Sequence, residues 1–375
     1  MPPLPPNITK TGLLRGLGGW NNSSLSRRNN TVRGLLSTRV PQSLDTTSGG
    51  ILNPSIGIGV TRLAMPRNAA GTWRRVATIG NITNIPNVWS TPTMQVNGSW
   101  QSVATDEQGT WVAVSVNGRQ IRSTDNGNTW EYSALELSGT WKCVATSNGT
   151  WIAVNAGVFP TFQGSQMRSI DGGITWQLAD TPALRGWQSV AGDGAGNWVC
   201  VGAEAIARSD DDGVTWVFAT TPIFDMLDGV ATDTKGNWVA VGFSGKQIRS
   251  NSNGDIWEEA TIQLPGFWRS VASDKNGTWV AVAENGRMAR SNDNGNTWQY
   301  SNVEIDGDWR SVTSGGNGVW GTVGTDGRQA FSRNNGITWQ YSEVMVPGEW
   351  YGIASDQRGN WVAVSQNNGQ ALSNG

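Results

Sequence analysis

Few residues in this sequence could carry chemistry. No histidine occurs among the 375 residues, which removes Ser-His-Asp and Cys-His catalysis, histidine-ligated metals and the usual near-neutral proton shuttle. The two cysteines, Cys143 and Cys200, occupy positions of an internal repeat where other copies carry serine or alanine. We therefore expect small core thiols rather than a disulfide bond or a nucleophile.

Carboxylates offer no better catalytic pattern. Glu136, Asp225, Asp308 and Glu349 lie on links between repeats and could form a glycosidase pair, but nothing in the sequence sets their separation. The run Asp210-Asp211-Asp212 lacks the ligand series and terminal glutamate of a calcium-binding hand. The sequence predicts no catalytic residue, no metal site and no cofactor, and hence a protein that is not an enzyme.

Regularly spaced tryptophans define the repeated elements that would position any functional site. A first series opens W-x-x-[V/I] segments, with Leu227 in place of one member, at Trp100, Trp141, Trp187, Trp268, Trp309 and Trp350. A second series follows 10 or 11 residues later at Trp111, Trp151, Trp198, Trp238, Trp279, Trp320 and Trp361, and a third closes each unit at Trp130, Trp176, Trp216, Trp257, Trp298 and Trp339. These series define seven repeats of about 41 residues.

Each repeat has the pattern of four short strands. In the first repeat we expect strand a over 100–104, strand b over 110–115, strand c over 119–123 and strand d over 129–133. Asn117-Gly118 is a two-residue hairpin turn between strands b and c. The predicted fold class is all-β, a seven-bladed β-propeller of four-stranded blades.

The link from strand c to strand d is the most specific motif. It reads Ser-x-Asp-x-Gly-x-Thr-Trp at 123–130, 169–176, 209–216 and 291–298, with degenerate copies at 250–257 and 332–339. It resembles the Asp-box, or bacterial neuraminidase repeat. That resemblance implies a structural role for Asp125, Asp171, Asp211 and Asp293, each accepting backbone N–H bonds within its own turn.

The seventh repeat stops after strand c, at residues 371–375. Residues 68–73, Asn-Ala-Ala-Gly-Thr-Trp, match the end of an Asp box followed by strand d. We expect residues 66–76 to supply the missing strand, so that N-terminal sequence pairs with the C-terminal blade and closes the ring.

Residues 1–60 are predicted to form an anchoring arm, ahead of a propeller over 61–375. The arm carries six basic residues against Asp45 alone, although the whole chain has a net charge of −2. Its expected partner-binding residues are Arg15, Arg27, Arg28, Arg33 and Arg39. The acidic remainder argues against nucleic-acid binding. The start of the chain lacks a secretory pattern and no stretch of 18 apolar residues occurs, so we expect a cytoplasmic origin and no membrane insertion.

A ligand site is predicted on the face formed by the b–c turns and the d–a links. The longest loops there carry Trp89, Phe159 and Phe162, and basic residues after the b–c turns recur at Arg119, Arg287 and Arg328. The alternative for the arginines is a structural role, stacking on an aromatic ring or pairing with a neighbouring blade.

The combination resembles Asp-box propellers of bacteriophage virion proteins. The resemblance implies a structural or adhesive role in tail or capsid, with the arm on other virion proteins and the ring on a host-surface glycan or a neighbouring subunit. A free lectin, an assembly scaffold like those of photosystems, and a sialidase-like hydrolase are the alternatives. A sialidase would need an arginine triad, a Tyr–Glu pair and an early Phe-Arg-Ile-Pro motif, and that motif is absent. The sequence does not define an oligomeric state.

Overall fold

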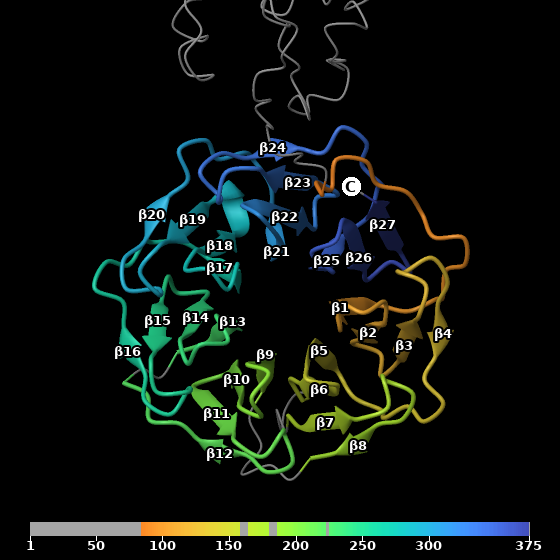
Figure 1. Ribbon diagram of the computed structural model, residues 1–375, viewed down its shortest axis with the longest axis horizontal. Helices are drawn as coiled ribbons and strands as arrows, with labels where there is room; N and C mark the ends of the chain where they lie inside the picture. Colours follow the sequence, from red (N-terminus) through yellow and green to blue (C-terminus); the bar gives the residue numbers. More distant parts are fainter. Residues whose placement is uncertain (1–83, 158–163, 180–185, 223–224, 375) are drawn as a thin grey trace, which may run out of the picture. The chain divides into compact units, whose positions relative to one another are not determined.

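The computed structural model describes residues 84–157, 164–179, 186–222 and 225–374. These residues form seven antiparallel sheets around a central axis (Figure 1). Six sheets run from strand a at the axis to strand d at the outside, and the sheet of blade seven has strands a to c. The predicted all-β, seven-bladed propeller is confirmed. Helical structure in the described residues is limited to one 3₁₀ turn, η2 (Glu284–Gly286), and no helix there is long and apolar enough to span a bilayer.

The strands follow the repeat closely. Blades one to three comprise β1 (Trp100–Thr105), β2 (Trp111–Ser115), β3 (Gln120–Ser123), β4 (Glu131–Tyr132); β5 (Trp141–Ser147), β6 (Thr150–Asn155), β7 (Gln166–Ser169), β8 (Gln177–Leu178); β9 (Trp187–Gly192), β10 (Trp198–Gly202), β11 (Ala205–Ser209) and β12 (Val217–Phe218). Blades four and five comprise β13 (Leu227–Thr232), β14 (Trp238–Gly242), β15 (Gln247–Ser250), β16 (Glu258–Glu259); β17 (Trp268–Ser273), β18 (Trp279–Ala283), β19 (Met288–Ser291) and β20 (Gln299–Tyr300). Blades six and seven comprise β21 (Trp309–Gly316), β22 (Val319–Gly324), β23 (Gln329–Ser332), β24 (Gln340–Tyr341); β25 (Trp350–Ser355), β26 (Asn360–Ser365) and β27 (Gln370–Asn374).

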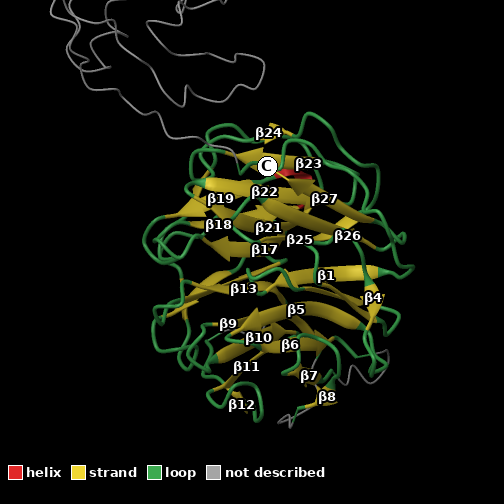
Figure 2. Ribbon diagram, turned by 45° about the vertical axis from the view of Figure 1, so that its right-hand side comes forward, coloured by secondary structure: helices red, strands yellow, loops and turns green. Residues whose placement is uncertain are grey.

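The hydrophobic core lies between blades rather than within one. Strand b is buried at every position in blades one to six, as in β2, and at all but Asn360 in blade seven, because each of its faces packs against a neighbouring blade. In the cluster between blades one and seven, Trp111 and Trp130 of blade one pack with Val362 and Val364 of blade seven. Burying one such large apolar side chain contributes about 1.5–3 kcal/mol, so seven interfaces of this kind hold the ring. Figure 2 shows the strands in the middle of the ring and the connecting loops at its two faces.

The c–d turns explain the spacing of the Asp-box-like motif. In blade one, Asp125 Oδ1 accepts bonds from Ser123 Oγ and Thr129 N–H, both at 2.8 Å, and Oδ2 accepts from Thr129 Oγ1 at 2.7 Å. Gly127 has φ +81°, and a Cβ there would lie 2.6 Å from Val362 Cγ2 of the adjacent blade. Only glycine meets both requirements, since other residues rarely adopt this φ.

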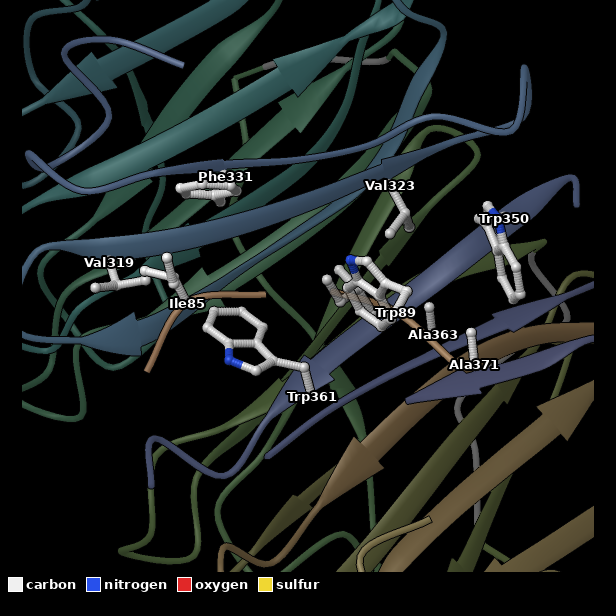
Figure 3. Close-up of a cluster of buried hydrophobic side chains, with 10 residues drawn as sticks. Ile85, Trp89, Val319, Val323, Phe331, Trp350, Trp361, Ala363 and Ala371 are labelled. Carbon is white, nitrogen blue, oxygen red and sulfur yellow. The ribbon is translucent and has the colours of Figure 1, made fainter. Parts of the chain in front are cut away.

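The ring is closed by residues 87–90 rather than by the predicted residues 66–76, which lie outside the described residues. Ser90 and Leu372 exchange two backbone hydrogen bonds, of 2.9 and 2.8 Å, so the chain near Ser90 lies beside β27 as the fourth strand of blade seven. Trp89 then occupies the place of the third-series tryptophan, and it packs with Trp350, Trp361 and Ala371 (Figure 3). The predicted mode of closure is confirmed, but the predicted segment is wrong.

The sequence misled because residues 68–73 match the repeat better than residues 84–89 do. Asn84-Ile-Pro-Asn-Val-Trp89 lacks the glycine and threonine of the motif. Its position is instead set by bonds that are equivalent to those of other blades. Trp89 Nε1 donates to Pro86 O at 3.1 Å, as Trp130 Nε1 donates to Gly127 O at 2.8 Å.

Candidate binding site at one mouth of the central channel

The seven a strands line a central channel. Each a strand starts on the face of the b–c turns and d–a links, so the residue after each first-series anchor lies at that mouth. These residues line a cavity of about 400 Å³, and they are Gln101, Lys142, Gln188, Asp228, Arg269, Arg310 and Tyr351. We call them the mouth ring. The seven positions are equivalent in the repeat, yet they hold five different residue types, whereas the framework around them is repeated.

Below the mouth ring the channel wall is regular. Ser102 Oγ accepts the Val144 N–H at 3.1 Å, and Ser270 Oγ accepts the Val312 N–H at 3.2 Å. Each of these bonds joins strand a of one blade to strand a of the next. The wall therefore holds the mouth-ring residues at fixed relative positions.

Charge is concentrated on one side of the mouth ring. Glu284 Oε1 accepts a hydrogen bond from Arg269 Nη2 at 2.8 Å and forms an ion pair with Arg310 Nη2, also at 2.8 Å. Arg269 Nη1 lies 3.4 Å from Asp228 Oδ1, and Asp228 Oδ2 is buried without a hydrogen-bond partner among the described residues. With Lys142, three cationic side chains meet two anionic ones. The cluster carries an excess positive charge.

Burial shifts the ionisation of two residues of the ring. Burial raises the pKa of Asp228 above its ordinary value, although Arg269 opposes the shift. Burial lowers the pKa of Lys142, and the charge of Asp228 opposes it. Both shifts indicate that water does not fully solvate the charges of this cavity.

Aromatic side chains flank the charged side of the ring. Phe243 and Phe267 stack with their ring centroids 4.6 Å apart, and they remain 37% and 43% exposed. The Arg269 guanidinium lies 4.5 Å from the Phe243 centroid, and that of Arg310 lies 5.8 Å from the Tyr351 centroid. An exposed apolar surface thus adjoins an electropositive pocket, which is the composition of a recognition site.

The predicted ligand-binding arginines lie on the same face but are engaged elsewhere. Arg119 is paired with Glu136 at 2.7 Å, Arg287 with Glu304 at 3.5 Å and Arg328 with Asp326 at 2.8 Å. Their guanidinium groups stand over rings of the same blades, 4.2, 4.8 and 5.7 Å from the centroids of Tyr132, Tyr300 and Tyr341. Arg119 belongs to blade one, Arg287 to blade five and Arg328 to blade six, so they do not form one cluster.

The predicted aromatic ligand residues do not form a site with these arginines either. Trp89 is 2% exposed, because its indole fills the seam between blades six and seven, and it offers no free ring to a ligand. Phe159 and Phe162 lie outside the described residues. So do residues 1–60, with Arg15, Arg27, Arg28, Arg33 and Arg39, and the predicted boundary of the arm.

The predicted structural aspartates all bond within their own turns. Asp171, Asp211 and Asp293 accept from the threonine of the motif at 2.6, 2.6 and 2.7 Å, as Asp125 does. Burial raises the pKa of each carboxyl, but the hydrogen bonds from the threonine and serine of the turn outweigh it, and the pKa lies below its ordinary value.

Neither cysteine thiol lies in an environment that favours a reactive thiolate. Cys200 is fully buried, and Cys143 lies in the wall of the mouth cavity. Burial raises the pKa of both thiols, which suppresses the reactive thiolate. Among the described residues, no group of three or more acidic or thiol side chains could hold a metal ion.

The mouth ring was not predicted from the sequence. The signal for it lies at the first x of W-x-x-[V/I], because that position changes from Gln to Lys, Asp, Arg and Tyr while its neighbours repeat. In a repeat protein, variation at one equivalent position is a usable signal of function. The acid Glu284 was also missed, since it lies in an ordinary b–c turn.

Comparisons with known proteins identify the fold alone. No family model matches the chain, and no curated protein matches it. Solved structures do match it, among them YCF48 bound to D1 peptide, with TM-score 0.60, 18% identity, 78% of this chain and 98% of that chain covered. YCF48 from Cyanidioschyzon merolae matches with TM-score 0.60, 16% identity and coverage of 76% and 98%. A streptogramin B lyase matches with TM-score 0.63, 13% identity and coverage of 76% and 97%.

The last of these matches corrects one prediction. The absence of catalytic residues led us to predict that the protein is not an enzyme, but a streptogramin B lyase has the same fold. Because this fold is compatible with catalysis, the prediction that the protein is not an enzyme is not maintained. What the comparisons support is a chain with the fold of a seven-bladed β-propeller shared by YCF48 and a lyase.

Proposed function

We propose that the protein is a partner-binding protein, and that the mouth ring recognises an acidic segment of another protein. The observation that carries this proposal is the convergence of Arg269 and Arg310 on a single carboxylate oxygen, Glu284 Oε1, at 2.8 Å each. Guanidinium groups present planar donor pairs that suit carboxylates. Two of them held side by side at a cavity mouth are arranged for a carboxylate.

The surroundings support a peptide as the ligand. The stacked Phe243 and Phe267 give an exposed apolar contact next to the charged pocket, so that a segment with an acidic and an apolar side chain would meet both. The cavity of about 400 Å³ admits side chains rather than a folded domain. One structure of this fold, that of YCF48, contains a bound peptide.

The virion role belongs to the same proposal. The sequence predicts that residues 1–60 anchor the ring to a bacteriophage particle and that the ring binds a host-surface glycan or a neighbouring subunit. For the neighbouring subunit, we propose the mouth ring as the contact. Electron microscopy of purified particles tests this part, because density for residues 1–60 against a capsid or tail protein is expected, and particles without the protein would contradict it.

Peptide binding is tested on the isolated protein. An array of peptides containing Asp or Glu is screened beside the same peptides with Asn or Gln, and the best binder is titrated. We expect retention of acidic peptides only, and a loss of at least about tenfold in affinity in Arg269→Gln/Arg310→Gln. The matched control is Arg287→Gln/Arg328→Gln, on the same face, which should bind normally. Equal weakening by both double variants, or no selective retention, would contradict the proposal.

A further inference from the structure

Lys142 differs from the other lysines that the structure describes. Each of the other three has a partner for its Nζ, which is Glu259 for Lys246 at 2.8 Å, Glu107 for Lys275 at 3.3 Å, and the Lys275 carbonyl for Lys235. Lys142 makes no hydrogen bond or ion pair within the described part of the chain, although it lies in the wall of the mouth cavity. Its amine is therefore open to a ligand that enters this cavity.

The position of Lys142 in the mouth ring explains why it is unpaired. Its neighbours in the ring, on blades one and three, are Gln101 and Gln188, which carry no charge. The acids of the cluster lie on blades four and five, where Asp228 and Glu284 pair with the two guanidinium groups of the ring. Two acids thus compensate two guanidinium groups, and the excess positive charge of the cluster belongs to Lys142.

The wall of the cavity also changes the chemistry of this amine. Lys142 is half-buried, and burial lowers its pKa below the ordinary value, although the charge of Asp228 opposes the shift. At neutral pH a larger share of Lys142 than of an exposed lysine is therefore the neutral amine, which is the nucleophilic form. Desolvated lysines of this kind form imines with carbonyl compounds.

The cavity around Lys142 suits a small molecule that carries a carboxylate. Its volume of about 400 Å³ lies within the range of small-molecule sites. Arg310 pairs with a single acid among the described residues, Glu284, and a guanidinium group has more N–H donors than one carboxylate uses, so donors remain for a second. An iminium formed on Lys142 is positively charged, and a carboxylate on the same ligand would compensate that charge.

We propose that Lys142 is a covalent binding site for small carbonyl compounds that carry a carboxylate, the class of 2-oxo acids and aldehyde acids. The lone pair of the amine adds to the carbonyl carbon, the C–O bond breaks, and the oxygen leaves as water. Of the three protons of the ammonium form, two leave with that water and one stays on the nitrogen of the iminium. The carboxylate of the ligand lies towards Arg310. This activity does not rest on peptide binding, which needs no covalent bond.

Reductive trapping on the full chain tests the proposal. Glyoxylate is the probe, and sodium cyanoborohydride reduces its imine to N-carboxymethyl-lysine, which peptide mass spectrometry locates. At pH 7 and limiting glyoxylate, we expect modification of Lys142 to exceed that of each control lysine of the same chain by at least about fivefold. The controls are Lys235, Lys246 and Lys275. Equal or lower modification of Lys142 would overturn the proposal.

A second probe tests the need for the carboxylate. Acetaldehyde has the same reactive group without it, so the ratio of glyoxylate to acetaldehyde modification at Lys142 should fall about threefold in Arg310→Gln. Arg287→Gln, on the same face, is the control and should leave the ratio unchanged. An unchanged ratio in Arg310→Gln, whose fold circular dichroism verifies, overturns the assignment of a carboxylate. If this variant does not fold, the wild type decides, because equal selectivity for Lys142 with both probes overturns it as well.

The peptide array keeps this inference distinct from the proposed function. If acidic peptides are retained but Lys142 is not selectively modified, only the covalent site is refuted. Selective modification of Lys142 without retention of any acidic peptide refutes only the peptide-binding proposal.

Discussion

The indole Nε1 of Trp89 donates to Ser342 Oγ at 3.3 Å, across 253 residues of chain. The bond joins the segment before blade one to the end of blade six. The same Ser342 Oγ donates to Pro86 O at 2.6 Å, so the serine holds the closing segment at two points. Trp176 and Ser133 repeat this relationship between blades two and one, which shows that the closing segment reproduces an ordinary blade contact.

Closure by Trp89 gives the first prediction. Trp89→Ala should lower the free energy of unfolding by about 3–5 kcal/mol, the usual cost of removing a buried tryptophan, because it opens the seam between blades six and seven. Urea titration followed by tryptophan fluorescence measures the change. Trp73→Ala is the matched control, since Trp73 is the residue that the sequence predicted in this place. A larger loss in Trp73→Ala than in Trp89→Ala would show that the closing segment is assigned wrongly.

The four aspartates of the c–d turns give a prediction for pH. The pKa of Asp125 lies below its ordinary value of 3.8 in the folded protein, and the other three shift in the same direction. A lowered folded pKa means that the unfolded chain binds more protons. The stability that these groups contribute is therefore complete above about pH 5 and is lost as the pH falls through the lowered values.

The change from Asp to Asn isolates that contribution. Asn334 already performs the role in blade six, where its Oδ1 accepts the Thr338 N–H at 3.0 Å and its Nδ2 donates to Thr338 Oγ1 at 2.9 Å. The variant with Asn at 125, 171, 211 and 293 should fold, be less stable than the wild type at pH 7, and lose less stability between pH 5 and pH 3. Thermal unfolding across this range measures the slope. Parallel curves for the two proteins would contradict the linkage.

Two glycines allow the cost of backbone strain to be distinguished from the cost of a steric clash with the added Cβ. Gly127 and Gly149 have φ of +81° and +83°, but an added Cβ would meet Val362 Cγ2 at 2.6 Å at Gly127 and nothing within 4 Å at Gly149. Gly149→Ala should cost about 1 kcal/mol for the left-handed conformation alone. Gly127→Ala should cost a further 1–3 kcal/mol or so for overpacking. Equal losses in chemical denaturation would show that the blade interface yields to the extra methyl group.

Glu284 gives the fourth prediction, on the mouth ring. Glu284→Gln removes the carboxylate shared by Arg269 and Arg310, so these two charges become available to a ligand. We expect acidic peptides to bind roughly three- to tenfold more tightly, with steeper dependence on salt concentration, and the protein to lose about 1–3 kcal/mol of stability. Glu304→Gln, which frees only Arg287, is the control and should not change affinity. Weaker peptide binding in Glu284→Gln would mean that Glu284 itself positions the arginines.

The sequence was sufficient for the framework and insufficient for the site. Tryptophan spacing and Asn-Gly turns predicted the blades because each blade must place a large side chain at the same seam, and strand a was expected over 100–104 and is found at Trp100–Thr105. The closing segment escaped because Trp89 is placed by contacts with blades 253 residues or more away, not by its local motif.

The mouth ring could not be assembled from spacing alone. Arg269 and Arg310 are 41 positions apart and meet at Glu284 only because strands β17 and β21 are neighbours at the axis. The repeat predicts that neighbourhood, but side-chain reach and charge pairing decide which residues meet. The sequence pointed instead to Arg287 and Arg328, and each of these is paired with an acid of its own blade.

The pairing of Ser90 with Leu372 spans 282 residues. This separation sets the earliest time during translation at which the ring can close. At roughly 5–20 residues per second, the ribosome releases Leu372 about 15–60 s after Ser90 has been made. Throughout that interval the closing segment lacks β27 as its partner strand. Its unpaired backbone groups are then accessible to other nascent chains. The ring therefore cannot close before Leu372 has been made, and a chain that stops before this residue leaves the outer edge of blade seven without its partner segment.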